Sequence, residues 1–246
     1  MKTEKRIQYI IDWIKQYCNS IKYQPVTLVI GVSGGVDSAV TSTLSAKTGL
    51  KTIAVSIPIK QNQEQQELSI KHLEWLKSNF NNVCTKVISL DNVFSSFKET
   101  MYDFKNNLAF ANSRSRLRMT TLYQIAQSNN GLVVGTGNKV EDFGVGFYTK
   151  YGDGGVDISP LADCTKTQVW EIASKMSIMK DIIDEQPTDG LWDDSRNDER
   201  QLGLTYKQIE EAMDNTESKY YEKYMQIRKP NLHKMKPIPV CLFEDD

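Results

Sequence analysis

The amino-acid sequence predicts an α/β protein with a doubly wound parallel sheet flanked by helices and a helical C-terminal extension. Short apolar runs typical of buried strands alternate with longer segments in which apolar residues recur at helical spacing. This alternation is typical of βαβ units, whose strands pair in parallel. The chain of 246 residues can bury a sizeable core, and its 39% hydrophobic and 25% charged residues are ordinary for a globular protein.

The strands and helices of the N-terminal half can be assigned in order. The chain opens with an amphipathic helix, because Ile7, Ile10 and Ile14 recur on one helical face. The elements expected after it are a strand at 26–32, a helix from residue 36, a strand at 52–57, a helix around 68–76, a strand at 83–90, a helix at 113–127 and a strand at 131–135.

The C-terminal part departs from this alternation. The segment Asp189–Gly203 is polar, charged and poor in apolar residues, so we expect a mobile loop that can act as a lid. From Thr205 the chain is expected to be helical, because Thr205 and Gln208 have the spacing of a capping box. Neither a repeat nor a low-complexity linker divides residues 1–246, which predicts one domain.

Composition and charge argue against several classes of protein. Lys plus Arg is 30 and Asp plus Glu is 31, and a net charge of -1 gives no support for nucleic-acid binding. The four cysteines lack CxxC spacing and there are two histidines, which argues against a structural zinc site. The longest apolar run, Val26–Val32, is too short to span a membrane. We therefore expect a cytoplasmic protein with reduced thiols and no membrane partner.

The most informative segment is Gly31-Val-Ser-Gly-Gly-Val-Asp-Ser38, between the first strand and the next helix. Its glycines allow a tight turn with inward-facing amides, and Ser33 and Ser38 add hydroxyl donors beside a helix N-terminus. An ordinary strand-to-helix turn with Asp37 in the first helical turn would also use glycine. Because this loop lies at the carboxyl end of a buried strand, where α/β sheets bind ligands, we expect an anion site. It matches neither the Walker A nor the GxGxxG pattern.

Two glycine-rich loops follow later strands. Gly135–Asp142 follows the fourth strand and offers the Thr136 hydroxyl and the Glu141 carboxylate, although an ordinary loop with solvated charges would have the same composition. Gly146–Asp157 contains more glycine than a simple turn requires, which favours a shaped ligand site.

Lys166 stands out because of its position in a helix. Thr165 and Gln168 have capping-box spacing, which places Lys166 in the first helical turn, where the macrodipole disfavours a cation. A phosphate bound there would remove the conflict, whereas a solvated surface lysine would tolerate it.

Together these motifs resemble a known enzyme family. The SGG-x-DS loop is similar to the pyrophosphate-binding loop of the ATP pyrophosphatase superfamily, with its adenine nucleotide alpha hydrolase-like fold. Over nearly the whole chain the motifs resemble those of ammonia-dependent NAD synthetases. Beyond the first loop they are GT-x-N-x-x-E at Gly135–Glu141, FTKYGDGG-x-D at Phe147–Asp157, TK at Thr165-Lys166, Pro187-Thr188 and HK-x-x-P-x-P at His233–Pro239.

This resemblance implies a ligase that makes NAD from deamido-NAD (nicotinic acid adenine dinucleotide). In that reaction ATP adenylates the nicotinate carboxylate, pyrophosphate leaves, and ammonia attacks the acyl-adenylate to form the amide. The resemblance also implies Mg²⁺ as cofactor and a homodimer whose active sites are shared between subunits. It implies no nucleophile or general base, so Asp37 and Lys166 would act by positioning and charge stabilisation.

The resemblance further implies which residues bind each ligand. ATP would be bound by Gly31, Val32, Ser33, Gly34, Gly35, Val36, Asp37, Ser38, Thr136, Lys166 and Thr188. Mg²⁺ would be held by Asp37 and Glu141. Deamido-NAD would be bound by Asn112, Arg116, Lys150, Asp157, His233 and Lys234, with Arg116 reaching across from the neighbouring subunit. Arg114 and Arg118 cannot share one helical face with Arg116, and we expect them to be solvated.

Two details and two alternatives stay open. Asp142 competes with Glu141 for the metal, and Ser56–Gln63 lacks the arginine that family members often carry for ATP, which leaves the adenine contacts undefined. Another enzyme of the superfamily, such as a GMP synthetase or a tRNA-thiolating enzyme, is one alternative. The other is a non-catalytic nucleotide-binding module, which would need neither Glu141 nor Lys166. The chain length leaves no room for a glutaminase domain, so we expect free ammonia as the nitrogen donor.

Overall fold

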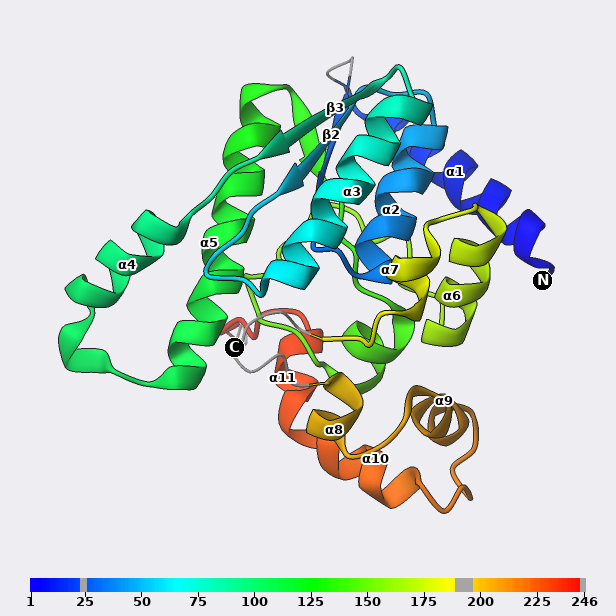
Figure 1. Cartoon of the computed structure of the whole chain (residues 1–246). Coiled ribbons are helices and arrows are strands. Elements are labelled where there is room, and N and C mark those ends of the chain that lie inside the picture. The colour runs from blue at the N-terminus through cyan, green and yellow to red at the C-terminus, as the bar shows by residue number, and fades with distance from the viewer. Residues whose placement is uncertain (23–25, 189–196, 244–246) are drawn as a thin grey trace.

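A four-stranded parallel sheet lies at the centre of the protein, whose computed structural model describes residues 1–22, 26–188 and 197–243 (Figure 1). The strands are β1 (Thr27–Gly31), β2 (Thr52–Ser56), β3 (Val83–Val87) and β4 (Gly131–Val133), in the spatial order β3-β2-β1-β4. The predicted parallel sheet is therefore confirmed. Because the strand order reverses at β1, a crevice is expected where β1 and β4 end.

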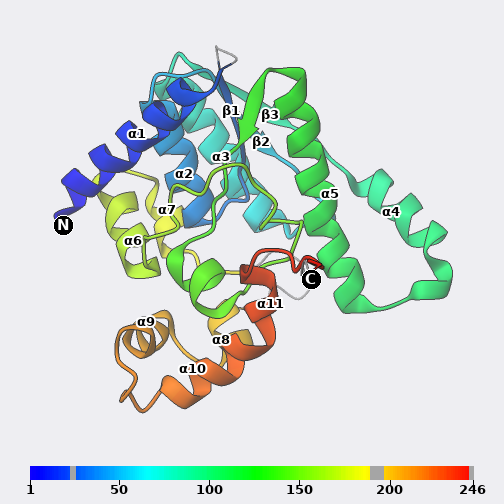
Figure 2. The same cartoon turned by 180° about the vertical axis from the view of Figure 1, so that it is seen from behind.

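Helices cover both faces of the sheet (Figures 1 and 2). One face carries α1 (Thr3–Ser20), α2 (Val36–Lys47), α3 (Gln63–Asn79) and α6 (Lys166–Lys175), and the other carries α5 (Asn107–Ser128). Leu28 and Ile30 of β1 pack with α1, α2 and α6, whereas Val29 packs with α5. Burial on both faces explains why this strand is a continuous apolar run rather than an alternating one.

The region between β3 and β4 differs from the prediction. The strand expected at 83–90 ends at Val87, because α4 (Asp91–Thr100) begins soon after it. The backbone N–H groups of Ile88 and Leu90 still donate to the carbonyls of Ser56 and Pro58, so the chain continues alongside β2. The helix expected at 113–127 begins earlier, at 107, since the Asn106 side chain accepts from the N–H of Ala109 and caps it.

The helical C-terminal extension is also confirmed. From Thr205 it comprises α9 (Tyr206–Asp214), α10 (Tyr221–Arg228), η3 (Lys229–Asn231) and α11 (Leu232–Met235). Two earlier elements pack with it, the π-helix η2 (Lys139–Val145) and α8 (Asp198–Leu202), whereas α7 (Lys180–Asp184) follows α6 and contributes Ile182 to the core of the sheet domain. η2, α8, α9 and α10 share a small apolar core of their own. This layer lies on one side of the sheet domain in both views (Figures 1 and 2).

The predicted loop Asp189–Gly203 is wrong over part of its length. Asp198–Leu202 forms α8, whose first N–H groups donate to the Asn197 side chain and whose end is marked by Gly203 at φ 70°. Side-chain capping and a C-terminal glycine thus form a helix from a segment with little apolar periodicity. Residues 189–196 lie outside the described residues.

Two features concern cysteines and membranes. Cys18, Cys84, Cys164 and Cys241 are all free thiols. Among the described residues, no helix combines the length and the apolar character that crossing a bilayer requires.

Candidate functional site

The loop after β1 has the closed geometry expected of an anion site. The Ser38 hydroxyl accepts from the N–H of Ser33 at 3.1 Å and donates to the carbonyl of Gly35 at 2.9 Å. Gly34 has φ 96°, and a Cβ there would lie 2.5 Å from the carbonyl oxygen of Gln65. Any other residue at Gly34 would therefore be strained and would push α3 away. The loop leads directly into the N-terminus of α2.

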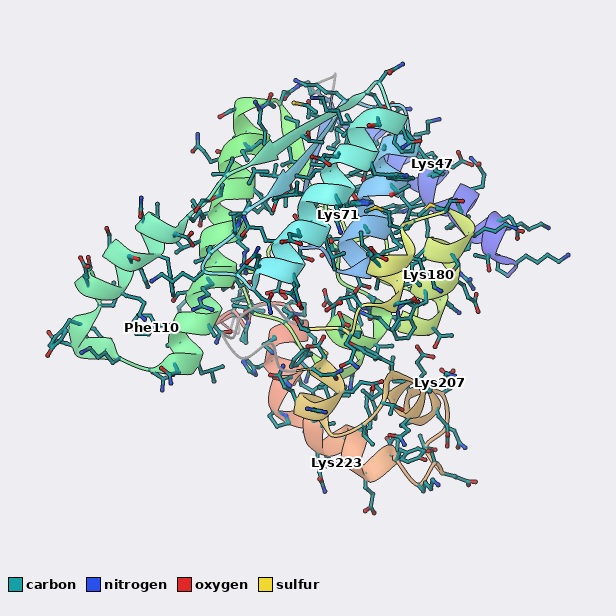
Figure 3. All side chains as sticks on the ribbon, in the orientation of Figure 1. Lys47, Lys71, Phe110, Lys180, Lys207 and Lys223 are labelled. Atoms are coloured by element: carbon teal, nitrogen blue, oxygen red, sulfur yellow. The ribbon has the colours of Figure 1, made fainter. Side chains whose placement is uncertain are left out.

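Three charged residues meet beside this loop, and we call them the charged cluster: Asp37, Glu141 and Lys166. The Lys166 ammonium lies 2.5 Å from Asp37 Oδ2 and 2.9 Å from Glu141 Oε1. The Lys166 side chain is 3% exposed and each carboxylate side chain is 16% exposed. Lysines labelled in Figure 3, such as Lys47 and Lys71, are instead exposed. The alternative of a solvated Lys166 is therefore wrong: two carboxylates balance its charge at the helix start.

Burial and mutual attraction determine the protonation of the charged cluster. Burial opposes the charge of Lys166, but Asp37 and Glu141 outweigh it and raise the lysine pKa. Burial likewise opposes ionisation of Glu141, yet Lys166 and the Tyr206 hydroxyl lower its pKa. Burial and the charge of Glu141 raise the pKa of Asp37, and Lys166 counters them in part. The charged cluster is thus a buried cation between two carboxyl groups.

Two residues that the sequence analysis did not single out hold these carboxylates. Asn138 donates to Asp37 Oδ1 at 3.1 Å, and its own side-chain oxygen accepts from the N–H groups of Val140 and Glu141. The hydroxyl of Tyr206 donates to Glu141 Oε1 at 2.6 Å. Asn138 lies inside the quoted GT-x-N motif, which is a usable signal. Tyr206 carried no comparable signal, because a residue that follows a helix cap is usually unremarkable.

A cavity of about 610 Å³ joins the charged cluster to the loop after β1. Most of the predicted site residues line it: Ser33, Gly34, Gly35, Val36, Asp37, Ser38, Asn112, Arg116, Thr136, Glu141, Lys150, Lys166, Thr188, His233 and Lys234. They come from the sheet domain and from the C-terminal layer, so the folded chain brings both parts of the sequence to one site.

Another part of the cavity lining carries basic side chains, and we call it the basic wall: Arg116, Lys150, His233 and Lys234. Arg116 Nε donates to the carbonyl of Lys150 at 3.3 Å, and the Lys234 ammonium donates to the carbonyls of Gly146 and Tyr148. Burial lowers the pKa of Lys234, although Asp153 and Asp142 counteract it. Within the described residues, no carboxylate lies within 4.0 Å of a basic-wall side chain.

The remaining predicted residues lie elsewhere. Gly31 and Val32 line a smaller adjoining slot of about 140 Å³, together with apolar residues of β2 and α5. Asp157 lines neither space: its carboxylate accepts from the Tyr123 hydroxyl at 3.0 Å and from the N–H of Val133 at 2.7 Å. In one chain, Asp157 and the basic wall are therefore not brought together.

The arginines beside Arg116 are less solvated than expected. Arg114 is 7% exposed, with its guanidinium carbon 5.0 Å from the centroid of the Phe94 ring, so the expectation of a solvated Arg114 is wrong. Arg118 is partly buried, and it donates to the carbonyl of Ile57 at 3.0 Å and to the Gln61 side chain at 3.4 Å. The charges of both are accommodated by an aromatic ring or by oxygen acceptors.

The charged cluster has the donor chemistry that Mg²⁺ requires. Asp37 and Glu141 already have a cation between them, and oxygen ligands suit a hard divalent ion. Among the described residues no group of three or more acidic, His or Cys side chains could form a metal cage by itself. One or two carboxylates completed by phosphate oxygens are a usual Mg²⁺ site. Asp142 also lines the cavity, but burial and the nearby carboxylates Asp153, Glu141 and Asp37 raise its pKa.

Comparisons with known proteins agree with this arrangement. The model of the NAD synthase family matches residues 6–237. An NH(3)-dependent NAD(+) synthetase from Carboxydothermus hydrogenoformans is 37% identical over 215 residues, which are 84% of this chain and 84% of that protein.

Two solved structures are similar to the whole chain. The NMN synthetase from Francisella tularensis superposes with a TM-score of 0.90 at 32% identity, covering 99% of this chain and 100% of that one. An NH3-dependent NAD synthetase from Campylobacter jejuni shares the fold, with a TM-score of 0.79 at 23% identity over 98% of this chain and 100% of that one. The family-model match and the level of identity over most of the chain show that this protein belongs to the NAD synthase family.

Proposed function

We propose that the protein is a ligase that amidates the nicotinate carboxylate of deamido-NAD with ammonia and consumes ATP. The observation that carries the proposal is the shared cavity, in which an anion-binding loop, the charged cluster and the basic wall face one another. A nucleotide-binding module without catalysis would need only the first of these. Membership of the NAD synthase family supports the same reaction.

ATP binding is supported by the loop Gly31–Ser38 and by the slot beside it. The loop amides and the N-terminus of α2 suit phosphates, and Thr136, Lys166 and Thr188 line the same cavity. The slot offers apolar walls for a flat base. Arg118 lies beside that slot and binds the carbonyl of Ile57, close to where the family's usual arginine is missing. We therefore assign the adenine end of ATP to this slot.

Mg²⁺ is assigned to Asp37 and Glu141 in preference to Asp142. Lys166 contacts the first two carboxylates, which supports this assignment because a cation is already stabilised beside them. The ion would neutralise charge that develops on the pyrophosphate leaving group. Lys166 would carry part of this charge as well, since its ammonium remains protonated in the buried cluster.

The basic wall and Asn112 are assigned to the anionic nucleotide substrate. Arg116 and Lys234 donate to carbonyl oxygens rather than to carboxylates, which leaves their charge available for phosphates. A homodimer with shared active sites is proposed from the family resemblance alone: Arg116, which was expected to reach across from a neighbouring subunit, lines the cavity of its own chain, and Asp157 is paired with Tyr123 outside the cavity. Residues 1–246 would form a single domain, and the free cysteines suit a cytoplasmic enzyme.

The chemistry requires positioning rather than a protein nucleophile. The nicotinate carboxylate attacks the α-phosphorus of ATP and pyrophosphate leaves, after which ammonia attacks the acyl carbon and AMP leaves. The residues of the cavity would align the two nucleotides and balance the charge that moves from one to the other. Neither step needs a side chain that becomes covalently modified.

A second candidate substrate is nicotinate mononucleotide, which the same chemistry would convert to NMN. The specific observation is the near-complete superposition on a structure described as an NMN synthetase, at 32% identity. A mononucleotide would place its single phosphate against the basic wall and would not need a contact with Asp157, which lies outside the cavity.

One experiment tests both candidates. The protein is incubated with Mg-ATP and either deamido-NAD or nicotinate mononucleotide, with and without an ammonium salt, and NAD, NMN and pyrophosphate are measured. We expect ammonium-dependent NAD formation with equal release of pyrophosphate. Faster amidation of the mononucleotide would favour the second candidate, and no amide from either nucleotide would refute both.

A further inference from the structure

Tyr206 is a buried polar side chain beside the charged cluster that the proposed reaction does not use directly. It is the first residue of α9 and is 1% exposed. Its hydroxyl donates to Glu141 Oε1 at 2.6 Å and lies 3.3 Å from Asp198 Oδ2. Its ring packs edge-on against Trp170 of α6, with centroids 5.8 Å apart. From α9, Tyr206 therefore contacts residues of α6, α8 and η2, beside the Glu141 carboxylate that is assigned to the metal.

The hydroxyl and the Lys166 ammonium bind the same oxygen of Glu141. Lys166 Nζ lies 2.9 Å from Glu141 Oε1, and the same Nζ lies 5.0 Å from the centroid of the Tyr206 ring. The Lys166 ammonium is shared between Glu141 and Asp37, whose Oδ2 lies closer, at 2.5 Å. The tyrosine contact comes from a rigid ring enclosed in the core of the C-terminal layer. Tyr206 therefore restrains Glu141 independently of Lys166.

We propose that Tyr206 is a positioning residue for the metal site, whose hydroxyl holds the Glu141 carboxylate in the orientation that accepts Mg²⁺ together with ATP. The inference rests on the proposed function, which assigns Glu141 to the metal. Tyr206 is absent from the cavity lining, so it acts through Glu141. Residues that orient a metal-binding carboxylate are often nearly as important as the ligand itself.

Tyr224 provides a matched control. It belongs to the same small core as Tyr206, is 6% exposed, and donates from its hydroxyl to the carbonyl of Gly144 at 3.3 Å. Tyr224→Phe removes a buried hydroxyl from the same layer, one that binds the backbone of η2 and makes no hydrogen bond to the Glu141 carboxylate. Tyr206→Phe keeps the packing against Trp170, and Lys166 still binds Glu141, so the fold should persist; circular dichroism checks this.

The test measures metal binding directly. Free Mn²⁺ is followed by electron paramagnetic resonance in the presence of the protein and a non-hydrolysable ATP analogue. We expect Tyr206→Phe to weaken Mn²⁺ binding by about 10- to 100-fold. Tyr224→Phe should stay within about twofold of the wild type. In steady-state kinetics, the Mg²⁺ concentration at half-maximal rate should rise in Tyr206→Phe more than kcat falls.

A double variant separates this inference from the assignment on which it rests. In Glu141→Gln, the further change Tyr206→Phe should cost no additional Mn²⁺ affinity, because the hydroxyl acts through the carboxylate. If Glu141→Gln binds Mn²⁺ weakly, Glu141 keeps its assignment to the metal. In that case, unchanged Mn²⁺ binding in Tyr206→Phe, or equal losses of Mn²⁺ affinity in the two tyrosine variants, would overturn only the positioning role of Tyr206. Wild-type Mn²⁺ binding by Glu141→Gln would overturn the metal assignment of Glu141 and the inference together.

Discussion

The charged cluster and the basic wall line the same cavity but differ in how their charges are balanced. Lys166 lies between Asp37 and Glu141, and all three side chains are largely buried. Arg116 and Lys234 bind carbonyl oxygens, and Arg116 is exposed. A buried charge must be compensated within the chain before a ligand arrives, whereas an exposed cation is compensated by water. The charges of the cluster are therefore compensated within a single chain, whereas the charge of Arg116 is left for the anionic substrate that we propose.

This difference predicts that the cluster affects both folding and turnover, and that the wall affects substrate affinity alone.

Lys166→Met should destabilise the protein most. The change leaves Asp37 and Glu141 as buried carboxylates without a cation, and breaking a buried pair in this way costs about 3–5 kcal/mol of unfolding free energy. Lys175→Met is the matched control on the same helix, because Lys175 pairs with Glu4 at the exposed surface. Such a surface pair is worth less than about 1 kcal/mol. Denaturant titration measures both, and similar losses would show that burial of Lys166 has no special role.

The difference in unfolding free energy between the wild type and Lys166→Met should depend on pH in a way that follows from the raised pKa of Lys166. A cation whose pKa is raised by folding contributes its full stability below its unfolded pKa, near 10.5, and loses it as pH rises through the folded pKa. The stability difference between wild type and Lys166→Met should therefore stay constant between about pH 7 and 9. A difference that declines across this range would contradict the raised pKa.

Asp37→Asn should abolish most of the turnover. Loss of a carboxylate from the cluster removes charge stabilisation around the leaving pyrophosphate, for which we expect a loss of about 100- to 1,000-fold in the rate of pyrophosphate release. Asp163→Asn is the control, since Asp163 is 96% exposed and pairs with Lys139 at the surface. Turnover by Asp37→Asn close to that of the control would remove Asp37 from the metal site.

Arg116→Ala should affect substrate binding without changing stability. Removal of a charged hydrogen-bond donor to a phosphate costs about 1.5–3 kcal/mol, which corresponds to a KM for deamido-NAD raised about 10- to 100-fold. The melting temperature should match that of the wild type, because Arg116 is exposed. Arg200→Ala, on α8 and outside the cavity lining, is the control. A large loss of stability in Arg116→Ala would contradict the claim that the basic wall, unlike the charged cluster, affects substrate affinity alone.

Ionic strength should have the smallest effect and should act on the wall alone. At about 0.1 M salt, exposed charges are screened beyond about 10 Å, and a further increase shortens that distance, whereas buried pairs are screened much less. Raising salt to about 0.5 M should therefore raise the KM for deamido-NAD about threefold. The stability difference between wild type and Lys166→Met should not change. Equal salt dependence of both quantities would show that the cluster is also accessible to ions.

The elements that depend on local pattern were predicted well. Short apolar runs located β1 and β2, which are buried on both faces, and apolar residues at helical spacing located α2. Boundaries set by single side chains were missed. Asn106 extends α5 toward its N-terminus, and Asn197 with Gly203 forms α8 in a segment that composition alone assigns to a loop.

The sequence also did not predict the π-helix η2, which positions Glu141 in the site. A loop with solvated charges would also have fitted Gly135–Asp142, but the Asn138 side chain caps the N-terminus of η2 and turns Glu141 into the cavity. Residue types and spacing identified Glu141 as a candidate, and they gave no measure of its burial.

By itself, the sequence determined the parallel sheet, the loop after β1, the family and most of the candidate residues, because these depend on short-range spacing and on residue type. The tertiary structure decided how the charges are combined. Lys166 is 129 residues from Asp37, and Tyr206 is 65 residues from Glu141. Contacts of this range form only when α2, η2, α6 and α9 pack together, so the compensation of Lys166 by two carboxylates and the restraint of Glu141 by Tyr206 are properties of the fold.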